Sequence, residues 1–314
     1  MKHEQMKLGD SPCKAKQRIS DDVRQQVLDL RRSHSLREVA AMTGLSLGTV
    51  KTLVSRSGKF RDNAKHRELF SLPPIRESEE TLPSVPEVPP QENVTGDRDV
   101  DAVLWLRSVI ATGEAALISR ALEAAKRIET PLEELEDRYR KYLVESNPGQ
   151  MWVALSSFGF ADLEGLATSS VKRKQLQVEA FARFGEALLE KTPAETFCIE
   201  TLAGLEHSGD WYEYDECAVA ERFKARPELM PQTLADCLHE LSYWSRLYDL
   251  RRAADRNFFD NFAEVEVRSS FVFALMAEIR PRDRAESKAV LRYLIENNCK
   301  EQTNSDAILE NLIG

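Results

Sequence analysis

Cysteine and histidine are scarce in this chain of 314 residues, which contains five of each. The cysteines are odd in number and widely scattered, and no CxxC pair occurs. Structural zinc sites and disulfide frameworks both need cysteines at regular, often close spacing. We therefore expect reduced thiols, with neither a zinc site nor a disulfide framework, as in a cytoplasmic protein.

Long apolar runs and glycine-rich phosphate loops are also missing. No segment approaches the roughly 20 apolar residues of a membrane-spanning helix. The polar first residues contain no apolar signal-peptide core, and no glycine-rich loop that would cradle a phosphate occurs. We expect a protein without membrane contact, cofactor or metal, and one that is not an enzyme.

The segment Leu36–Arg56, LREVAAMTGLSLGTVKTLVSR, carries the clearest pattern in the chain. Val39 is an apolar anchor, and the small Ala40 beside it allows two helices to approach closely. Gly44 stands where the first helix would end in a left-handed backbone conformation. Val50 would face inward from the second helix. This order predicts two short helices joined by a tight turn.

Helix-capping residues favour the same interpretation. Ser35 and Glu38, three residues apart, have the spacing of a capping box, and Ser46 can cap the second helix. Upstream, apolar residues on one face predict a supporting helix over about 21–33. The sequence therefore predicts a three-helix unit that contains a helix-turn-helix.

The residues Ser35–Arg56 resemble the helix-turn-helix of the resolvase/invertase and transposase family, which is homeodomain-like, and also that of sigma-factor region 4. The resemblance covers only the N-terminal part of the chain and implies binding to double-stranded DNA. Neither the α/β catalytic domain of a serine recombinase nor the mixed sheet of a transposase is evident. A helical hairpin that binds protein is the alternative.

In such a unit the outward residues of the second helix meet the DNA. The resemblance implies contacts to bases or phosphates from Leu47, Gly48, Thr49, Lys51, Thr52 and Ser55. Backbone phosphates are the expected partners of Arg56, Lys59 and Arg61. Thr49 and Thr52 suit a thymine methyl group or a base acceptor, and Lys51 suits a guanine or a phosphate. Plain solvent exposure is the alternative for each.

Charge is distributed very unevenly. The net charge of the chain is −9, which is unusual for a DNA-binding protein. Residues 1–71 contain fifteen Lys and Arg against eight Asp and Glu, a net of +7 that leaves −16 for the remainder. A small basic part on an acidic body predicts salt-sensitive DNA binding through the basic part alone.

Composition divides the chain into four parts. Residues 1–18 are predicted to form a flexible basic arm, and residues 19–71 the helix-turn-helix domain. Residues 72–98 hold six prolines and many acids, which predicts an extended linker, with a docking ligand as the alternative. Residues 99–314 are predicted to form a helical domain for oligomerisation or partner binding. The expected fold class is all-α.

Periodicity within the last part predicts its helices. One helix is expected over residues 100–129, another beginning with Pro131 at its first position, and another over residues 170–191. Residues 263–274 alternate like a strand, but their helical neighbours favour a helix. An aromatic concentration further along predicts core packing, with Trp211–Tyr212 as the first candidate for a ligand or partner contact.

Only one cluster suggests metal chemistry. Asp236, His239 and Glu240 would share one helix face, but a single helix without a partner is a weak metal site, and a histidine at the edge of the core is favoured. An enzyme tethered to DNA would require a pocket in residues 99–314 that contains paired acidic residues or a histidine.

The sequence thus predicts a sequence-specific DNA-binding transcriptional regulator of a bacterial or mobile-element gene, associated with the nucleoid. Its expected partners are double-stranded DNA, a second copy of the chain, and a protein that binds the C-terminal domain. The alternative is an accessory protein of DNA replication, partition or recombination that recruits other proteins to a DNA site.

Overall fold

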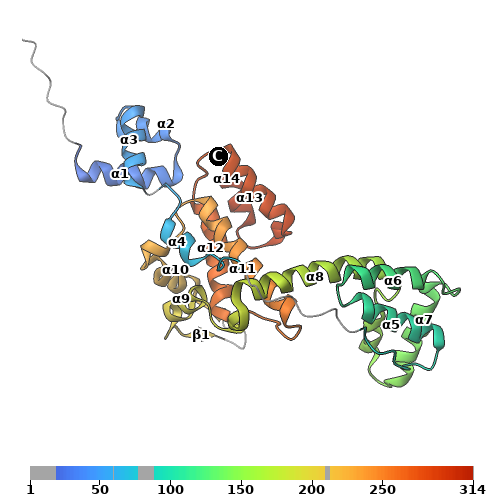
Figure 1. The fold of residues 1–314 in the computed structure, drawn as a ribbon. Helices are drawn as coiled ribbons and strands as arrows, with labels where there is room; N and C mark the ends of the chain where they lie inside the picture. Colours follow the sequence, from blue (N-terminus) through green and yellow to red (C-terminus); the bar gives the residue numbers. More distant parts are fainter. Residues whose placement is uncertain (1–18, 59, 77–87, 209–212, 314) are drawn as a thin grey trace, which may run out of the picture. The chain divides into compact units, whose positions relative to one another are not determined.

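The computed structural model describes residues 19–58, 60–76, 88–208 and 213–313 (Figure 1). In these ranges the regular structure is helical, apart from a short antiparallel pair of strands, β1 (His207–Ser208) and β2 (Glu213–Tyr214). The expected all-α fold class is confirmed. None of the helices in the described ranges combines the length and apolarity needed to cross a lipid bilayer.

The chain divides into two compact units. Unit 1 comprises Met1–Leu69, Thr201–Leu241 and Val267–Gly314, and unit 2 comprises Phe70–Glu200 and Ser242–Glu266. Helix α11 (Leu234–Ala254) contributes residues to both units. Each unit is therefore assembled from segments that are distant in the sequence.

Three short helices of unit 1 form what we call the α1–α3 bundle: α1 (Asp21–Ser33), α2 (Leu36–Thr43) and α3 (Leu47–Ser57). Each helix contributes one fully buried valine to a shared core, namely Val27, Val39 and Val50. The predicted helix over residues 21–33 is confirmed.

Side-chain caps fix the ends of these helices. The Ser35 hydroxyl accepts from the Glu38 amide at 3.3 Å, while the Glu38 carboxylate accepts from the Ser35 amide at 2.7 Å. Gly44 ends α2 with φ +67°, a conformation that glycine adopts without steric cost. The Ser46 hydroxyl accepts from the Thr49 amide at 3.1 Å. The predicted capping box, glycine turn and serine cap are all confirmed.

The rest of unit 1 contains a second apolar core. The elements of this part of unit 1 are α4 (Ala64–Leu69), α10 (Glu216–Lys224), η3 (Pro227–Leu229), the first part of α11, most of α12 (Ala263–Glu278), α13 (Arg284–Glu296), η4 (Cys299–Glu301) and α14 (Ser305–Ile313). The core is formed mainly by α11 to α14, and Leu234, Val272, Met276, Val290 and Ile308 are fully buried in it. The helix predicted over residues 263–274 is confirmed by α12.

Unit 2 is a helical assembly with its own core. Its elements are α5 (Arg98–Ile110), α6 (Ala115–Ala125), α7 (Leu132–Ser146), η1 (Met151–Ser157), α8 (Leu163–Phe184), η2 (Gly185–Leu189), most of α9 (Pro193–Leu202) and the end of α11. Val103, Ile110, Leu135 and Phe160 are buried where α5, α7 and the start of α8 meet.

The single helix predicted over residues 100–129 is wrong, because the chain breaks between α5 and α6. Gly113 has φ +76°, and a Cβ there would lie 2.7 Å from the Lys174 Cβ and 2.8 Å from the Ser170 carbonyl oxygen. The close approach of α8 thus requires a residue without a side chain at Gly113. The sequence has helical periodicity on both sides of Gly113, so it does not reveal the close approach of α8 at this position.

Two other helix boundaries differ from the prediction. The helix expected over residues 170–191 is α8, which begins earlier because Asp162 caps it and ends at Phe184 before Gly185. Pro131 is the N-cap of α7 rather than its first helical residue. Both differences arise at helix ends, where several neighbouring residues can serve as the boundary.

We expect Gly113→Ala to destabilise the protein by about 2–5 kcal/mol, the sum of left-handed strain and a steric clash. Gly149→Ala is the matched control, since Gly149 has φ +86° but no atom within 4 Å of the added Cβ. It should cost only about 1–2 kcal/mol. Urea denaturation followed by circular dichroism measures both, and equal losses would show that the α8 contact is unimportant.

Candidate nucleic-acid interface

Helix α3 presents one face to solvent on the side opposite its buried Val50. At about 100° per residue, the exposed residues Gly48, Lys51, Thr52, Ser55 and Arg56 all project from this face. The structure therefore brings together five of the predicted contact residues, and we call this group the α3 face.

The other predicted contact residues lie elsewhere. Leu47 and Thr49 are half-buried at the edges of the α3 face, and Arg61 is exposed beyond the end of the helix. Lys59 falls outside the described residues. Gly58 ends α3 with φ +74°, so the chain changes direction before Arg61.

Two threonine hydroxyls make hydrogen bonds within the helix itself. Thr52 Oγ1 donates to the Gly48 carbonyl at 2.9 Å, and Thr49 Oγ1 lies 2.8 Å from the Ser46 hydroxyl that caps the helix. The Thr52 hydroxyl proton is thus already bonded to the Gly48 carbonyl oxygen. The methyl group and the lone pairs of the hydroxyl oxygen remain available for a ligand. Local spacing alone did not indicate this restriction.

Basic side chains around the α3 face are not neutralised by neighbours. Across the described ranges, Lys51, Arg56 and Arg61 take part in none of the salt bridges. The nearby Glu38 is held as a cap instead, because hydrogen bonds from the Ser35 backbone and side chain lower the pKa of its carboxyl. The α3 face thus combines positive charge with small polar groups.

The residues Gly44–Gly48 also match the GxSxG spacing of a hydrolase nucleophile. That motif places its serine on a sharp turn between a strand and a helix. Here Ser46 instead follows helix α2 and caps α3 through the Thr49 amide. The local geometry is therefore that of a helix cap.

The acidic cluster on α11 is buried and forms hydrogen bonds with distant parts of unit 1. Asp236 accepts from the Asn63 amide at 2.9 Å and from Arg67 Nε at 2.7 Å. Glu240 pairs with Arg268 at 2.7 and 2.8 Å and lies 2.7 Å from His66 Nε2. We call this group the buried ionic cluster.

His239 stands apart from that cluster, half-buried, with Nε2 3.3 Å from the Arg67 carbonyl oxygen. Within the described ranges no three His, Cys, Asp or Glu residues are placed to hold a metal ion. Sequence reasoning found the acids of the buried ionic cluster but missed its partners, because Asn63 and Asp236 are 173 positions apart.

The aromatic concentration separates into buried and exposed members. In unit 2, Tyr243 and Trp244 are buried, and both pack edge-to-face on Phe70, at 5.9 and 5.6 Å between ring centroids. Burial raises the pKa of Tyr243 to about 12. Phe259, in contrast, is exposed. Trp211–Tyr212, the predicted contact pair, lies outside the described residues.

Comparison of the chain with models of known protein families, with curated proteins and with solved structures found no match.

Proposed function

We propose that this protein is a sequence-specific DNA-binding transcriptional regulator that reads its site with α3. The observation that carries the proposal is the α3 face, which combines Lys51, Arg56 and short polar residues opposite a buried valine. A helix of this size fits the major groove, where such side chains meet base edges and phosphates.

The support around α3 fits the same role. Residues that contact bases must be held rigidly. Helix α3 is fixed by the Ser46 cap at its start, by Gly58 at its end, and by the packing of Val50 in the core. Positive charge concentrated in the first 71 residues would attract DNA, while the acidic remainder would be repelled by it. DNA would thus meet the protein through the α1–α3 bundle.

The deciding experiment selects bound sequences from a random duplex pool, with the full chain at near-physiological salt. Enrichment of an inverted repeat, with half-sites about 34 Å apart or a multiple of this, would support a regulator that binds as a dimer. Enriched direct repeats would favour the accessory role in replication, partition or recombination. Absence of any enrichment would contradict sequence-specific binding.

We expect Lys51→Glu to weaken binding to the selected site by about 1–3 kcal/mol, since it removes a groove contact and adds repulsion. The matched control is Lys172→Glu, which makes the same change of charge at an exposed position of α8. It should leave the affinity nearly unchanged. Titration by fluorescence anisotropy measures both, and equal effects would contradict the assignment of α3.

A further inference from the structure

Large apolar side chains are exposed on the short helix η1 of unit 2. The exposed fractions are 80% for Met151, 67% for Trp152, 60% for Leu155 and 68% for Phe158. In a 3₁₀ helix residues three apart eclipse each other, so Trp152 and Leu155 lie in one row, which Phe158, the C-cap of η1, extends to about 12 Å. Contiguous exposure of this kind marks a binding surface, which we call the η1 surface.

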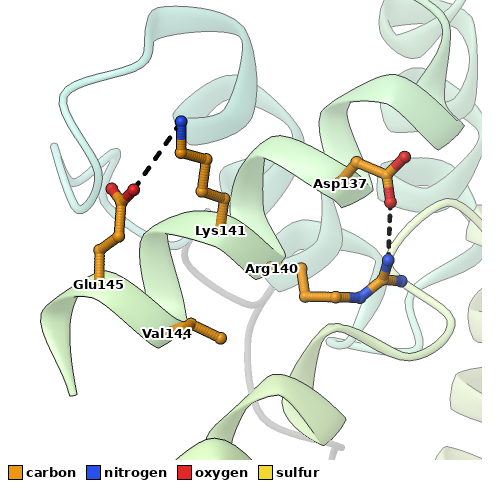
Figure 2. A pocket seen from close by; sticks show the side chains of 5 residues that line it. All are labelled: Asp137, Arg140, Lys141, Val144 and Glu145. Carbon is orange, nitrogen blue, oxygen red and sulfur yellow. Dashed lines mark hydrogen bonds and ion pairs between the residues drawn. The ribbon is translucent and has the colours of Figure 1, made fainter. Parts of the chain in front are cut away.

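The surroundings of the η1 surface are acidic. Residues 132–162 contain six Asp and Glu against three Arg and Lys. Arg107 of α5 donates to the Gly159 and Phe160 carbonyl oxygens, and with this residue included the net charge is −2. Figure 2 shows a shallow hollow on the adjoining α7, where Val144, itself exposed, lies among charged side chains. Two ion pairs join those side chains, Asp137–Arg140 at 2.6 Å and Lys141–Glu145 at 3.8 Å. The excess negative charge disfavours DNA and anionic lipid as occupants.

A second exposed apolar surface lies on α13 of unit 1, and its charge is opposite. Leu291 and Ile295 are 43% and 57% exposed. At 100° per residue, Arg284, Lys288 and Arg292 project from the same side of the helix, away from the buried Val290. Residues 280–292 carry a net of +3, although residues 72–314 as a whole carry −16. We call this the α13 surface.

The three basic side chains of the α13 surface have no neighbours to neutralise them. None of them enters a salt bridge within the described ranges, whereas the nearby Arg282 pairs with Asp62 and Glu286. The face from Arg284 to Ile295 is about 16 Å long at 1.5 Å per residue, which is comparable to the row on η1. The two surfaces are comparable in length, both expose apolar side chains, and they are opposite in charge.

We propose that the η1 surface of one copy binds the α13 surface of a second copy. The two surfaces are different, so the contact is heterologous, and successive copies form a closed ring or an open chain rather than a two-fold dimer. The driving force is burial of the aromatic and aliphatic side chains, while the opposite charges set the register. This inference does not depend on DNA binding, and the two-fold dimer that an inverted repeat implies would use a different contact between copies.

The test measures self-association of the full chain by sedimentation velocity over a wide range of concentrations. We expect the wild type to associate beyond two copies. Trp152→Asp and Ile295→Asp should each raise the apparent dissociation constant about 30-fold or more, as for loss of an interface hot spot. Arg284→Glu combined with Arg292→Glu tests the charge separately and should weaken association as well.

Mixing the two single variants gives the decisive result. Each variant retains one intact surface, so the mixture should form a complex that contains one copy of each variant, and no larger assembly. Phe259→Asp is the matched control, because Phe259 has a similar exposed fraction of 66% but lies on neither surface, and it should associate like the wild type.

Three outcomes would overturn the proposal. One is a wild type that stays monomeric throughout, and another is association that neither single variant weakens. The third is a mixture of the two variants that fails to associate, which would show that the η1 surface and the α13 surface are not partners. Circular dichroism confirms that each variant is folded, and none of these results bears on whether α3 binds DNA.

Discussion

Replacing Glu240 with alanine is expected to lower the free energy of unfolding of unit 1 by about 3–5 kcal/mol, the usual cost of leaving one member of a buried ion pair alone. Glu240, Arg268 and His66 are all fully buried, and the carboxylate interacts with both of the other side chains. The guanidinium of Arg268 would lose its counter-charge without regaining water.

Urea denaturation, with hydrogen exchange to locate the effect, measures this loss. Glu221→Ala on α10 is the matched control, because Glu221 is exposed, and it should change stability by less than about 0.5 kcal/mol. The double variant Glu240→Met with Arg268→Met should be more stable than Glu240→Ala, since it removes both charges. If the double variant is no more stable than Glu240→Ala, the loss in free energy of unfolding comes from lost packing and not from the unpaired charge.

The same pair implies a dependence on pH. Burial opposes ionisation of Glu240, but the charge and hydrogen bonds of Arg268, together with His66, outweigh it and lower the pKa of the carboxyl below its ordinary value of 4.5. The stabilisation is therefore complete above that value and is lost as the pH falls through the lower, folded value. Glu240→Gln should flatten this part of the curve of stability against pH.

The second large effect is expected in unit 2, where Glu195→Ala should cost about 3–5 kcal/mol from the buried pair with Arg251 and about 1 kcal/mol from a lost cap. Glu195 accepts from the Thr192 amide at 2.7 Å and pairs with Arg251, whose Nη2 lies 2.9 Å from Oε2. Arg251 also donates to the carbonyl oxygens of Leu188 and Glu190.

Glu200→Ala is the control for this variant, since Glu200 lies on the same helix but is exposed. Hydrogen exchange of the α9 and α11 amides measures the two variants. If protection from hydrogen exchange drops equally in both variants, the ion pair of Glu195 contributes no more stability than an ordinary surface acid. Thr192→Ala removes the hydroxyl cap and the acceptor for the Tyr243 hydroxyl but leaves the ion pair in place, so its effect is measured separately from that of the pair.

Local rules predicted much of the α1–α3 bundle. The capping box of Ser35 and Glu38, the glycine turn and the Ser46 cap depend on residues within four positions of each other, so the sequence contains all the information. The outward face of α3 follows from the same periodicity. The capping contacts between Thr192 and Glu195 are local in the same way, whereas the link from Glu195 to Arg251 joins residues that are far apart in the sequence.

The failures share a different physical origin. The break at Gly113 is imposed by Ser170 and Lys174 of α8, which no periodicity between residues 100 and 129 reveals. The buried ionic cluster likewise joins residues whose pairing depends on the finished fold. The exposed apolar side chains of η1 and α13 are of the kinds that fill a core, so only their exposure in the folded chain distinguishes them from core residues.

The bonds between Asn63 and α11 constrain the order in which the protein can fold during synthesis. The α1–α3 bundle has its own core and can form soon after it emerges. The hydrogen bond from the Asn63 amide, however, can form only after Asp236, which is 173 residues further along, has been synthesised. At about 5–20 residues per second this delay lasts roughly 10–35 s. Throughout that interval, the segment that follows α3 remains available to chaperones and proteases.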